Sequence, residues 1–269
     1  MVTPVETTGQ NGSVRPNIAR IRDFWLEGSH NTPDDRKLAQ AIELCAPHIP
    51  YLVRAQRSLI RRLVAYLVEQ GITQFLDLGS GLPTNGHVHH VAQALNSATR
   101  VLYVDADPTL ADDSRMLIDG NDNAAFLVAD VREPRQIFDA PEFTRLIDLR
   151  EPVAVLMIEL LLHLPDEDDP AGVVAHYADV MAPGSHLALS HFCEDEQLLE
   201  GFQMFDRMML GDRPVVNLRS PQALTGFFGD LELVDPGVVP VPMWRPESEE
   251  DADRNPEQVQ MYVGVARKR

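Results

Sequence analysis

The sequence predicts an α/β protein built on a doubly wound, mainly parallel sheet with an all-helical extension at its amino-terminal end. From residue 73 onwards, short apolar runs alternate with amphipathic segments, a pattern typical of right-handed β-α-β crossovers. Residues 153–158 are β-branched and apolar on both faces, which indicates a central strand covered by helices on both sides. Residues 16–71, in contrast, carry helical patterns only.

Two short helices are expected at the start of this extension. The first begins at Pro16, places apolar residues at helical spacing, and ends at Gly28. The second follows Thr32, whose side chain can cap a helix that has Pro33 at its first position. Acidic residues in its first turn favour the same start because they complement the helix dipole.

A third, longer helix is expected over residues 51–70, closed by Gly71. One face carries an apolar stripe of leucines, and another carries Arg54, Arg57 and Arg61. The whole chain is therefore expected to divide into a disordered arm (1–15), a helical lid (16–71) and an α/β core (72–269) with an acidic loop (246–257).

The core is expected to alternate strands and helices before a less regular end. The expected strands are residues 74–78, 101–105, 125–130, 153–158, 186–191, 231–234 and 259–265. The expected helices are residues 87–95, 108–119, 170–182, 194–209 and 221–228. The last strand alternates apolar and polar residues and suits an antiparallel partner.

Composition excludes several classes of function. The 269 residues carry a formal charge of −18, so the surface as a whole repels nucleic-acid backbones and anionic lipid. Cys45 and Cys193 form neither a disulfide framework nor a CxxC zinc site. The sequence shows no secretory signal, and its most apolar run is too short for a membrane span and contains Glu159. We therefore expect a cytoplasmic protein without nucleic-acid or membrane partners.

Four successive strands end in an acid, and these acids are the most informative feature of the sequence. They are Asp77, Asp105, Asp130 and Glu159. Ligands of a doubly wound sheet bind outside the carboxyl ends of its strands. Carboxylates there can accept hydrogen bonds from ribose hydroxyls, an adenine amino group or an ammonium group.

The turn after Asp77 carries Gly79 and Gly81, but it lacks the third glycine that a dinucleotide fingerprint requires. Thr84 stands at that position, and Pro83 stiffens the turn. Together with the acid that ends the second strand, this pattern favours an adenosyl ligand without phosphates.

Several segments resemble a known family. Residues 75–81, 103–105, 128–131 and 161–166 are similar to the successive motifs of class I S-adenosylmethionine methyltransferases. Residues 81–88 resemble, more narrowly, a subfamily known only as S-adenosyl methyltransferase and formerly described as a domain of unknown function. The likeness covers about residues 16–265 and implies a Rossmann-like, seven-stranded methyltransferase sheet with S-adenosylmethionine as cofactor.

The resemblance also implies a role for individual residues. Gly79, Ser80 and Gly81 would contact the methionine part of the cofactor, and Glu159 and Leu160 would border the methionine and the sulfonium. Asp105 would bind both ribose hydroxyls. Ala106, Asp130 and Val131 would contact the adenine. Asp77 would orient the turn or bond the ammonium group through water.

Other candidate site residues leave two interpretations open. Arg57 could reach the cofactor carboxylate or belong to a solvated stripe, and the helices around Asn31 could cover the cofactor or only support the sheet. His163, and less strongly His191, could act in catalysis or be core histidines. His87, His89 and His90 are expected at a solvated helix start rather than in a metal site, and Met204, Met208 and Met209 are expected in packing.

We expect the reaction to be methyl transfer to a small-molecule acceptor without a metal ion. Two alternatives stay open at this point. One is a protein that binds S-adenosylmethionine or S-adenosylhomocysteine without transferring a methyl group, and the other is an NAD-dependent oxidoreductase.

Overall fold

The computed structural model describes residues 16–84, 86–193, 200, 216–247 and 260–269. The expected arm 1–15, nearly all of the helix 194–209 with its three methionines, and most of the acidic loop lie outside these residues.

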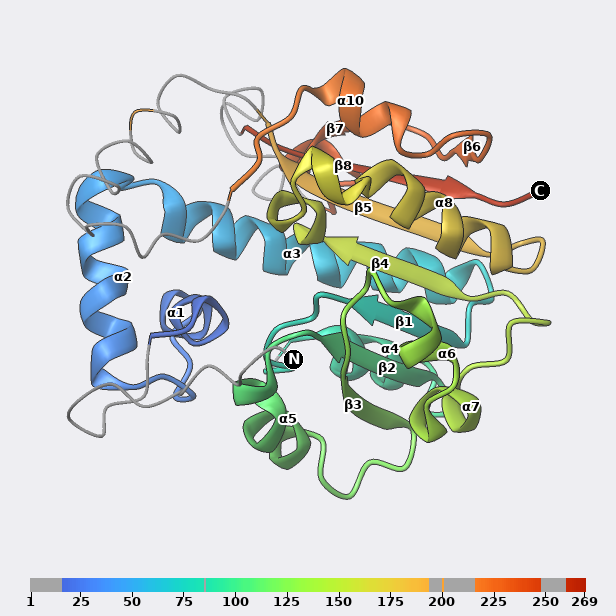
Figure 1. Cartoon of the computed structure of the whole chain (residues 1–269), viewed down its shortest axis with the longest axis horizontal. Helices are drawn as coiled ribbons and strands as arrows, with labels where there is room; N and C mark the ends of the chain where they lie inside the picture. The colour runs from blue at the N-terminus through green and yellow to red at the C-terminus, as the bar shows by residue number, and fades with distance from the viewer. Residues whose placement is uncertain (1–15, 85, 194–199, 201–215, 248–259) are drawn as a thin grey trace.

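One mixed sheet forms the centre of the fold, with strand order β3-β2-β1-β4-β5-β8-β6 (Figure 1). Four β-α-β crossovers make the first five strands parallel. These strands are β1 (Gln74–Leu78), β2 (Arg100–Asp105), β3 (Ala124–Val128), β4 (Ala154–Ile158) and β5 (His186–Phe192). The expected doubly wound sheet is confirmed, and β3 ends two residues before Asp130.

The carboxyl-terminal part of the sheet is antiparallel. β8 (Met261–Arg267) pairs with β5 on one side and with β6 (Glu232–Leu233) and β7 (Val239–Pro240) on the other. The expected antiparallel pairing of this last strand is confirmed, but its alternating sequence does not give alternating burial, because four successive residues, 263–266, are buried. An interior strand with layers on both faces buries both sets of side chains. The two-residue strand β7 was not expected from the sequence.

Helices cover both faces of the sheet. The cluster on one face includes residues from α3 (Ile49–Glu69), α4 (Val88–Leu95) and the start of α5 (Ala111–Leu117). The cluster on the other face includes residues from α6 (Pro134–Phe138), α7 (Pro141–Leu146), α8 (Pro170–Val180) and α10 (Pro221–Gly226). Helices α6 and α7, which are only one to two turns long, were not expected from the sequence.

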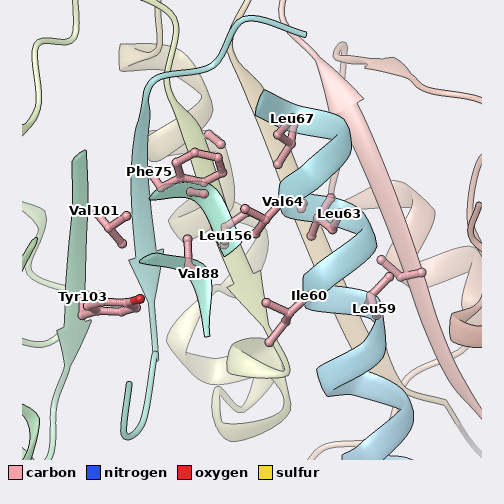
Figure 2. Close-up of a cluster of buried hydrophobic side chains, with 14 of the residues drawn as sticks. Leu59, Ile60, Leu63, Val64, Leu67, Phe75, Val88, Val101, Tyr103 and Leu156 are labelled. Carbon is pink, nitrogen blue, oxygen red and sulfur yellow. The ribbon is translucent and has the colours of Figure 1, made fainter. Parts of the chain in front are cut away.

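The long helix α3 anchors the amino-terminal extension to the sheet. Figure 2 shows its apolar stripe facing the side chains of Phe75 on β1 and Leu156 on β4. Val101 and Tyr103 of β2 belong to the same buried cluster, farther from α3. Leu59, Leu63 and Leu67 are completely buried, and each contributes about 1.5–3 kcal/mol through burial. The helix ends because Gly71 adopts a left-handed conformation, with φ of 85°.

The shorter helices α1 (Ile18–Trp25) and α2 (Pro33–Cys45) lie on the side towards which the parallel strands point (Figure 1). Thr32 and Asp35 form a capping box that starts α2, as the sequence indicates. Ile21 and Trp25 of α1 pack with Ala39 and Val53, so one face of α1 is held by α2 and α3. Ala19 and Arg22 of α1 contact the turns that follow β1 and β4.

Candidate functional site

The turn between β1 and α4 is built from two glycines in left-handed conformations. Gly79 has a φ of 70°, and Gly81 has a φ of 61°. The amide groups of Gly79 and Ser80 donate to the carbonyl of Val104 at 2.8 and 3.1 Å, which ties the turn to β2. A Cβ on Gly79 would lie 2.7 Å from Leu160, and one on Gly81 would lie 3.3 Å from Ala19 of α1. A side chain at Gly79 would therefore collide with Leu160, and one at Gly81 would be crowded by Ala19.

Asp105 ends β2 beside this turn. Its two oxygens accept from the amides of Gly81 at 2.8 Å and Asp107 at 3.0 Å. Burial raises the pKa of this carboxyl, while those two amides and the nearby His163 ring lower it. Each carboxylate oxygen can accept a further hydrogen bond. Ala106, the next residue, is exposed.

Asp130 and Val131 lie just beyond β3. The Asp130 carboxylate accepts from the backbone amide and the guanidinium of Arg132, and the side-chain hydrogen bond is the main reason why the pKa of Asp130 is lowered. Arg132 also bonds Asp168, so this edge of the site carries a small network of charges. The backbone carbonyl of Val131 accepts from the Tyr177 hydroxyl at 2.9 Å.

Glu159 follows β4 in a left-handed conformation, with φ of 61°, which is rare for such a residue. Its backbone amide donates to both the carbonyl and the hydroxyl oxygen of Ser190 on β5, at 3.0 and 3.1 Å. Its side chain is buried, and Oε2 forms an ion pair of 2.5 Å with Arg22 of α1. The other oxygen, Oε1, is buried and meets no hydrogen-bond partner among the described residues. Leu160 starts the short 3-10 turn that follows.

The three arginines on the polar face of α3 separate in the structure. Arg54 and Arg61 are exposed, but Arg57 is partly buried behind the glycine turn, and its Cδ would lie 3.7 Å from a Cβ on Gly86. Its Nη1 is buried and lacks a hydrogen-bond partner in the described part of the chain. Burial, and secondarily the charge of Arg22, lower the pKa of Arg57 to about 10.

Asp77 of β1 lies below the turn with 3% of its surface exposed. Burial raises the pKa of its carboxyl to about 8, although the charge of Arg57 opposes the shift. Oδ2 has no hydrogen-bond partner in the described residues and lies 3.6 Å from Nδ1 of His87. At neutral pH Asp77 is therefore mostly protonated.

The expectation of a solvated helix start at His87 and His89 is wrong, because both side chains are buried. Nδ1 of His87 accepts from the amide of Val88 and caps α4. Nδ1 of His89 lies 2.7 Å from the hydroxyl of Tyr103 on β2, and burial lowers the pKa of His89 to about 4. Neighbouring strands supply the partners that bury these rings, while His90 is exposed.

Asn31 belongs to a local network and not to the strand ends. Its amide nitrogen donates to Asp23 at 2.8 Å and to the carbonyl of Gly28 at 3.0 Å, and its oxygen accepts from Arg36. Asp23 is itself buried on α1. Asn31 thus shapes the loop between α1 and α2.

The two candidate histidines differ in environment. His163 ends the turn after β4 and is exposed. His191 is completely buried, and its Nε2 donates to the carbonyl of Asn217 at 2.9 Å. Burial, reinforced by Arg219, lowers the pKa of His191 to about 4, so it is neutral at physiological pH. His191 therefore meets the description of a core histidine.

The family model for S-adenosyl methyltransferase matches residues 6–269. The chain belongs to this family. This membership overrules the NAD-dependent alternative that the sequence left open, and it makes S-adenosylmethionine the cofactor. Among curated protein sequences, none matches this chain.

Solved structures agree with the family assignment. A Thermobifida fusca protein, described provisionally as a methyltransferase, is 36% identical with a TM-score of 0.85, over 95% of this chain and 96% of that one. A DUF574 family protein from Streptomyces avermitilis is 35% identical with a TM-score of 0.86, over 95% and 98%. The plantazolicin methyltransferase BpumL, solved with S-adenosylhomocysteine, is 11% identical with a TM-score of 0.52, over 93% and 95%, and shares the fold.

The residues at the strand ends fit the cofactor of this family. Two charged atoms of opposite sign, Arg57 Nη1 and Glu159 Oε1, are buried without hydrogen-bond partners in the described ranges. They complement the α-carboxylate and α-ammonium groups of a methionine moiety. Gly79 and Gly81 lack side chains, so the turn can lie close to Leu160 and Ala19, and Asp105 beside the turn retains acceptor capacity for hydroxyl groups.

Sequence reasoning missed several residues that shape this site. Arg22 reaches Glu159, and Asn17 donates a hydrogen bond to Asp107 after β2. Arg219 donates to the carbonyls of Leu161 and Leu164, both at 2.7 Å, and so holds the turn after β4. These contacts join residues that are 55 to 137 positions apart, so local sequence patterns do not predict them.

The described residues can also be compared with the requirements of a metal site, a second pocket and a membrane span. Within the described ranges, no group of three or more His, Cys, Asp or Glu side chains could hold a metal ion. A hollow of about 430 Å³ lies at the start of β3, lined by residues that include Arg115, Asn121 and Arg145. It opens at the amino-terminal edge of the sheet, opposite the glycine turn. No described helix is long and apolar enough to cross a membrane.

Proposed function

We propose that this chain transfers the methyl group of S-adenosylmethionine to a small-molecule acceptor by in-line displacement, at the carboxyl ends of β1, β2 and β4. The observation that carries this proposal is that two buried atoms near the glycine turn, Nη1 of the Arg57 cation and Oε1 of the Glu159 carboxylate, meet no hydrogen-bond partner among the described residues. A buried polar atom without a hydrogen-bond partner is costly, so one such atom on a cation and one on a carboxylate indicate a ligand that bonds both.

The proposed roles follow from this arrangement. Arg57 binds the carboxylate of the methionine part, and Glu159 accepts from its ammonium group. Gly79, Ser80 and Gly81 allow the close approach of the ligand, with Leu160 packed over the turn. Asp105 accepts from the two ribose hydroxyls.

The adenine end is proposed to lie near the end of β3. Ala106 would flank the ring, the backbone amide of Val131 would face it, and Asp130 would accept from its amino group. Asp130 remains able to do so while paired with Arg132, because a carboxylate has about four acceptor positions.

When bound, the cofactor supplies an activated methyl group on a sulfonium, and displacement leaves the electron pair of the broken carbon–sulfur bond on sulfur. The residues of the chain therefore need only align the acceptor and exclude water. His163, exposed beside Asp105, is positioned to take the proton of an acceptor that carries one, and this catalytic role is the one we propose for it.

We also propose that residues 16–71 act as a lid. The support is that α1 approaches the site at three points: Ala19 at the glycine turn, Asn17 at Asp107 and Arg22 at Glu159. Because α1 lies against the glycine turn, it would limit access to small acceptors. The net charge of −18 disfavours a nucleic-acid substrate. Asn31 would contribute by shaping the lid loop rather than by touching the cofactor.

Methyl transfer is tested with S-adenosylmethionine labelled in the methyl group and a pool of small-molecule metabolites. We expect label in a product of low molecular mass, and none with Arg57→Gln, which removes the charge for the cofactor carboxylate. Arg54→Gln is the matched control because it removes an exposed arginine from the same helix. Binding of S-adenosylhomocysteine without any transfer would favour a binding protein that lacks methyltransferase activity.

A further inference from the structure

Glu159 is held in an unusual way for a residue at the end of a strand. It combines a left-handed backbone, a buried carboxylate and an amide fixed by both oxygens of Ser190. A backbone in this conformation persists only when the surrounding structure determines it. The contacts therefore hold the carboxylate at one place, and they engage only one of its two oxygens.

The contact to that oxygen comes from the amino-terminal extension. Arg22 lies on α1, 137 positions away in the sequence, and its Nη1 pairs with Glu159 Oε2 at 2.5 Å. The guanidinium is one-quarter exposed, and Glu159 is its ion-pair partner in the described structure. Asn17, at the start of the same helix, is fixed by the side chains of Asp35 and Asp107.

The charges around the Arg22–Glu159 pair indicate which ligand group each side chain can bind. Arg22 and Arg57 are close enough for their charges to repel, since Arg22 lowers the pKa of Arg57. Glu159 neutralises Arg22, so Arg57 remains the cation available to a carboxylate. Glu159 Oε1 in turn remains available to a cation.

We propose that Arg22 is a positioning residue for the cofactor: it binds Oε2 of Glu159 and thereby presents Oε1 to the ammonium group of the methionine moiety. This inference rests on the proposed function. Through this contact α1 would couple closure over the site to the orientation of the carboxylate. If Arg22 only tethered α1 to the sheet, its effect on ligand affinity would not depend on the presence of Glu159.

The test is a double-mutant cycle with Arg22→Gln, Glu159→Gln and the double variant, with calorimetric affinities for S-adenosylhomocysteine. Each single variant should bind about tenfold more weakly, the equivalent of one charge-assisted hydrogen bond. The double variant should bind no more weakly than Glu159→Gln alone, because both substitutions remove the same interaction. Arg22→Lys should restore part of the affinity.

A second probe and a control variant make the result specific. The affinity for 5′-methylthioadenosine, which lacks the amino-acid part, should be the same for wild type and all three variants. Arg54→Gln is the control, since Arg54 is an exposed arginine on α3.

The outcomes separate the two proposals. Additive losses in the cycle, unchanged binding by Arg22→Gln, or equal losses with 5′-methylthioadenosine would overturn the role of Arg22 while leaving cofactor binding intact. Failure of the wild-type protein to bind S-adenosylhomocysteine would overturn the proposed function, and this inference with it.

Discussion

Replacing Asp105 with alanine tests the proposed ribose contact most directly. The carboxylate holds the amides of Gly81 and Asp107 and can still accept two hydroxyl groups. A hydrogen bond to a charged group contributes about 1.5–3 kcal/mol. Loss of one such bond weakens binding at least about tenfold, and loss of both weakens it about a hundredfold. Both S-adenosylhomocysteine and 5′-methylthioadenosine should be affected, since both contain the ribose.

The assay is isothermal calorimetry, with chemical unfolding to measure stability in parallel. The two backbone amides that lose their acceptor should lower the free energy of unfolding by about 1–3 kcal/mol, so binding must be measured well below the unfolding transition. Asp148→Ala is a matched control, because Asp148 also accepts from a backbone amide but lies at the opposite edge of the sheet. Affinity that is unchanged in Asp105→Ala and Asp148→Ala alike would refute the assignment.

Three further predictions concern Gly79, Asp77 and Arg219, which shape the site or support it. Gly79→Ala should abolish cofactor binding and lower the free energy of unfolding by about 1–2 kcal/mol, because the residue has a φ of 70° and its new Cβ would lie 2.7 Å from Leu160. Gly120→Ala is the control, since Gly120 has a φ of 75° but open space around it. Calorimetry and unfolding of this control should show the loss of stability with normal binding. Asp77 keeps a proton up to about pH 8 in the folded chain, whereas the unfolded chain releases it near pH 3.8, so wild-type stability should fall as pH rises through this window. Asp77→Asn should flatten that dependence in urea titrations between pH 4 and 8, and an unaltered slope would contradict the raised pKa. Arg219→Ala should lower the free energy of unfolding by about 1–3 kcal/mol, because it removes the donor to the buried carbonyl of Leu164 and one of the two donors to the carbonyl of Leu161. Hydrogen exchange should accelerate in residues 160–164 and not in β1.

Local patterns in the sequence predicted the five parallel strands, the three amino-terminal helices and the sheet edge that carries the acids. The capping box at Thr32 and the apolar runs of β1, β2 and β4 depend on neighbours within a few residues, and such signals can be read locally. Parallel strands bring their carboxyl ends to one edge, so the glycine turn, Asp105 and Glu159 had to meet there. The contacts of these residues with the cofactor stay predictions.

Which side chains of a repeated pattern are buried, and which partners they meet, depends on the packing of distant segments. Arg54, Arg57 and Arg61 look alike in the sequence, but Arg57 alone of these three lies behind the glycine turn with a buried Nη1. The pairing of Arg22 with Glu159 and the burial of His89 against Tyr103 likewise depend on segments far apart in the chain. The physical reason is that the environment of a polar side chain is set by whatever the fold packs against it, and helical or strand periodicity carries no information about a partner on another element.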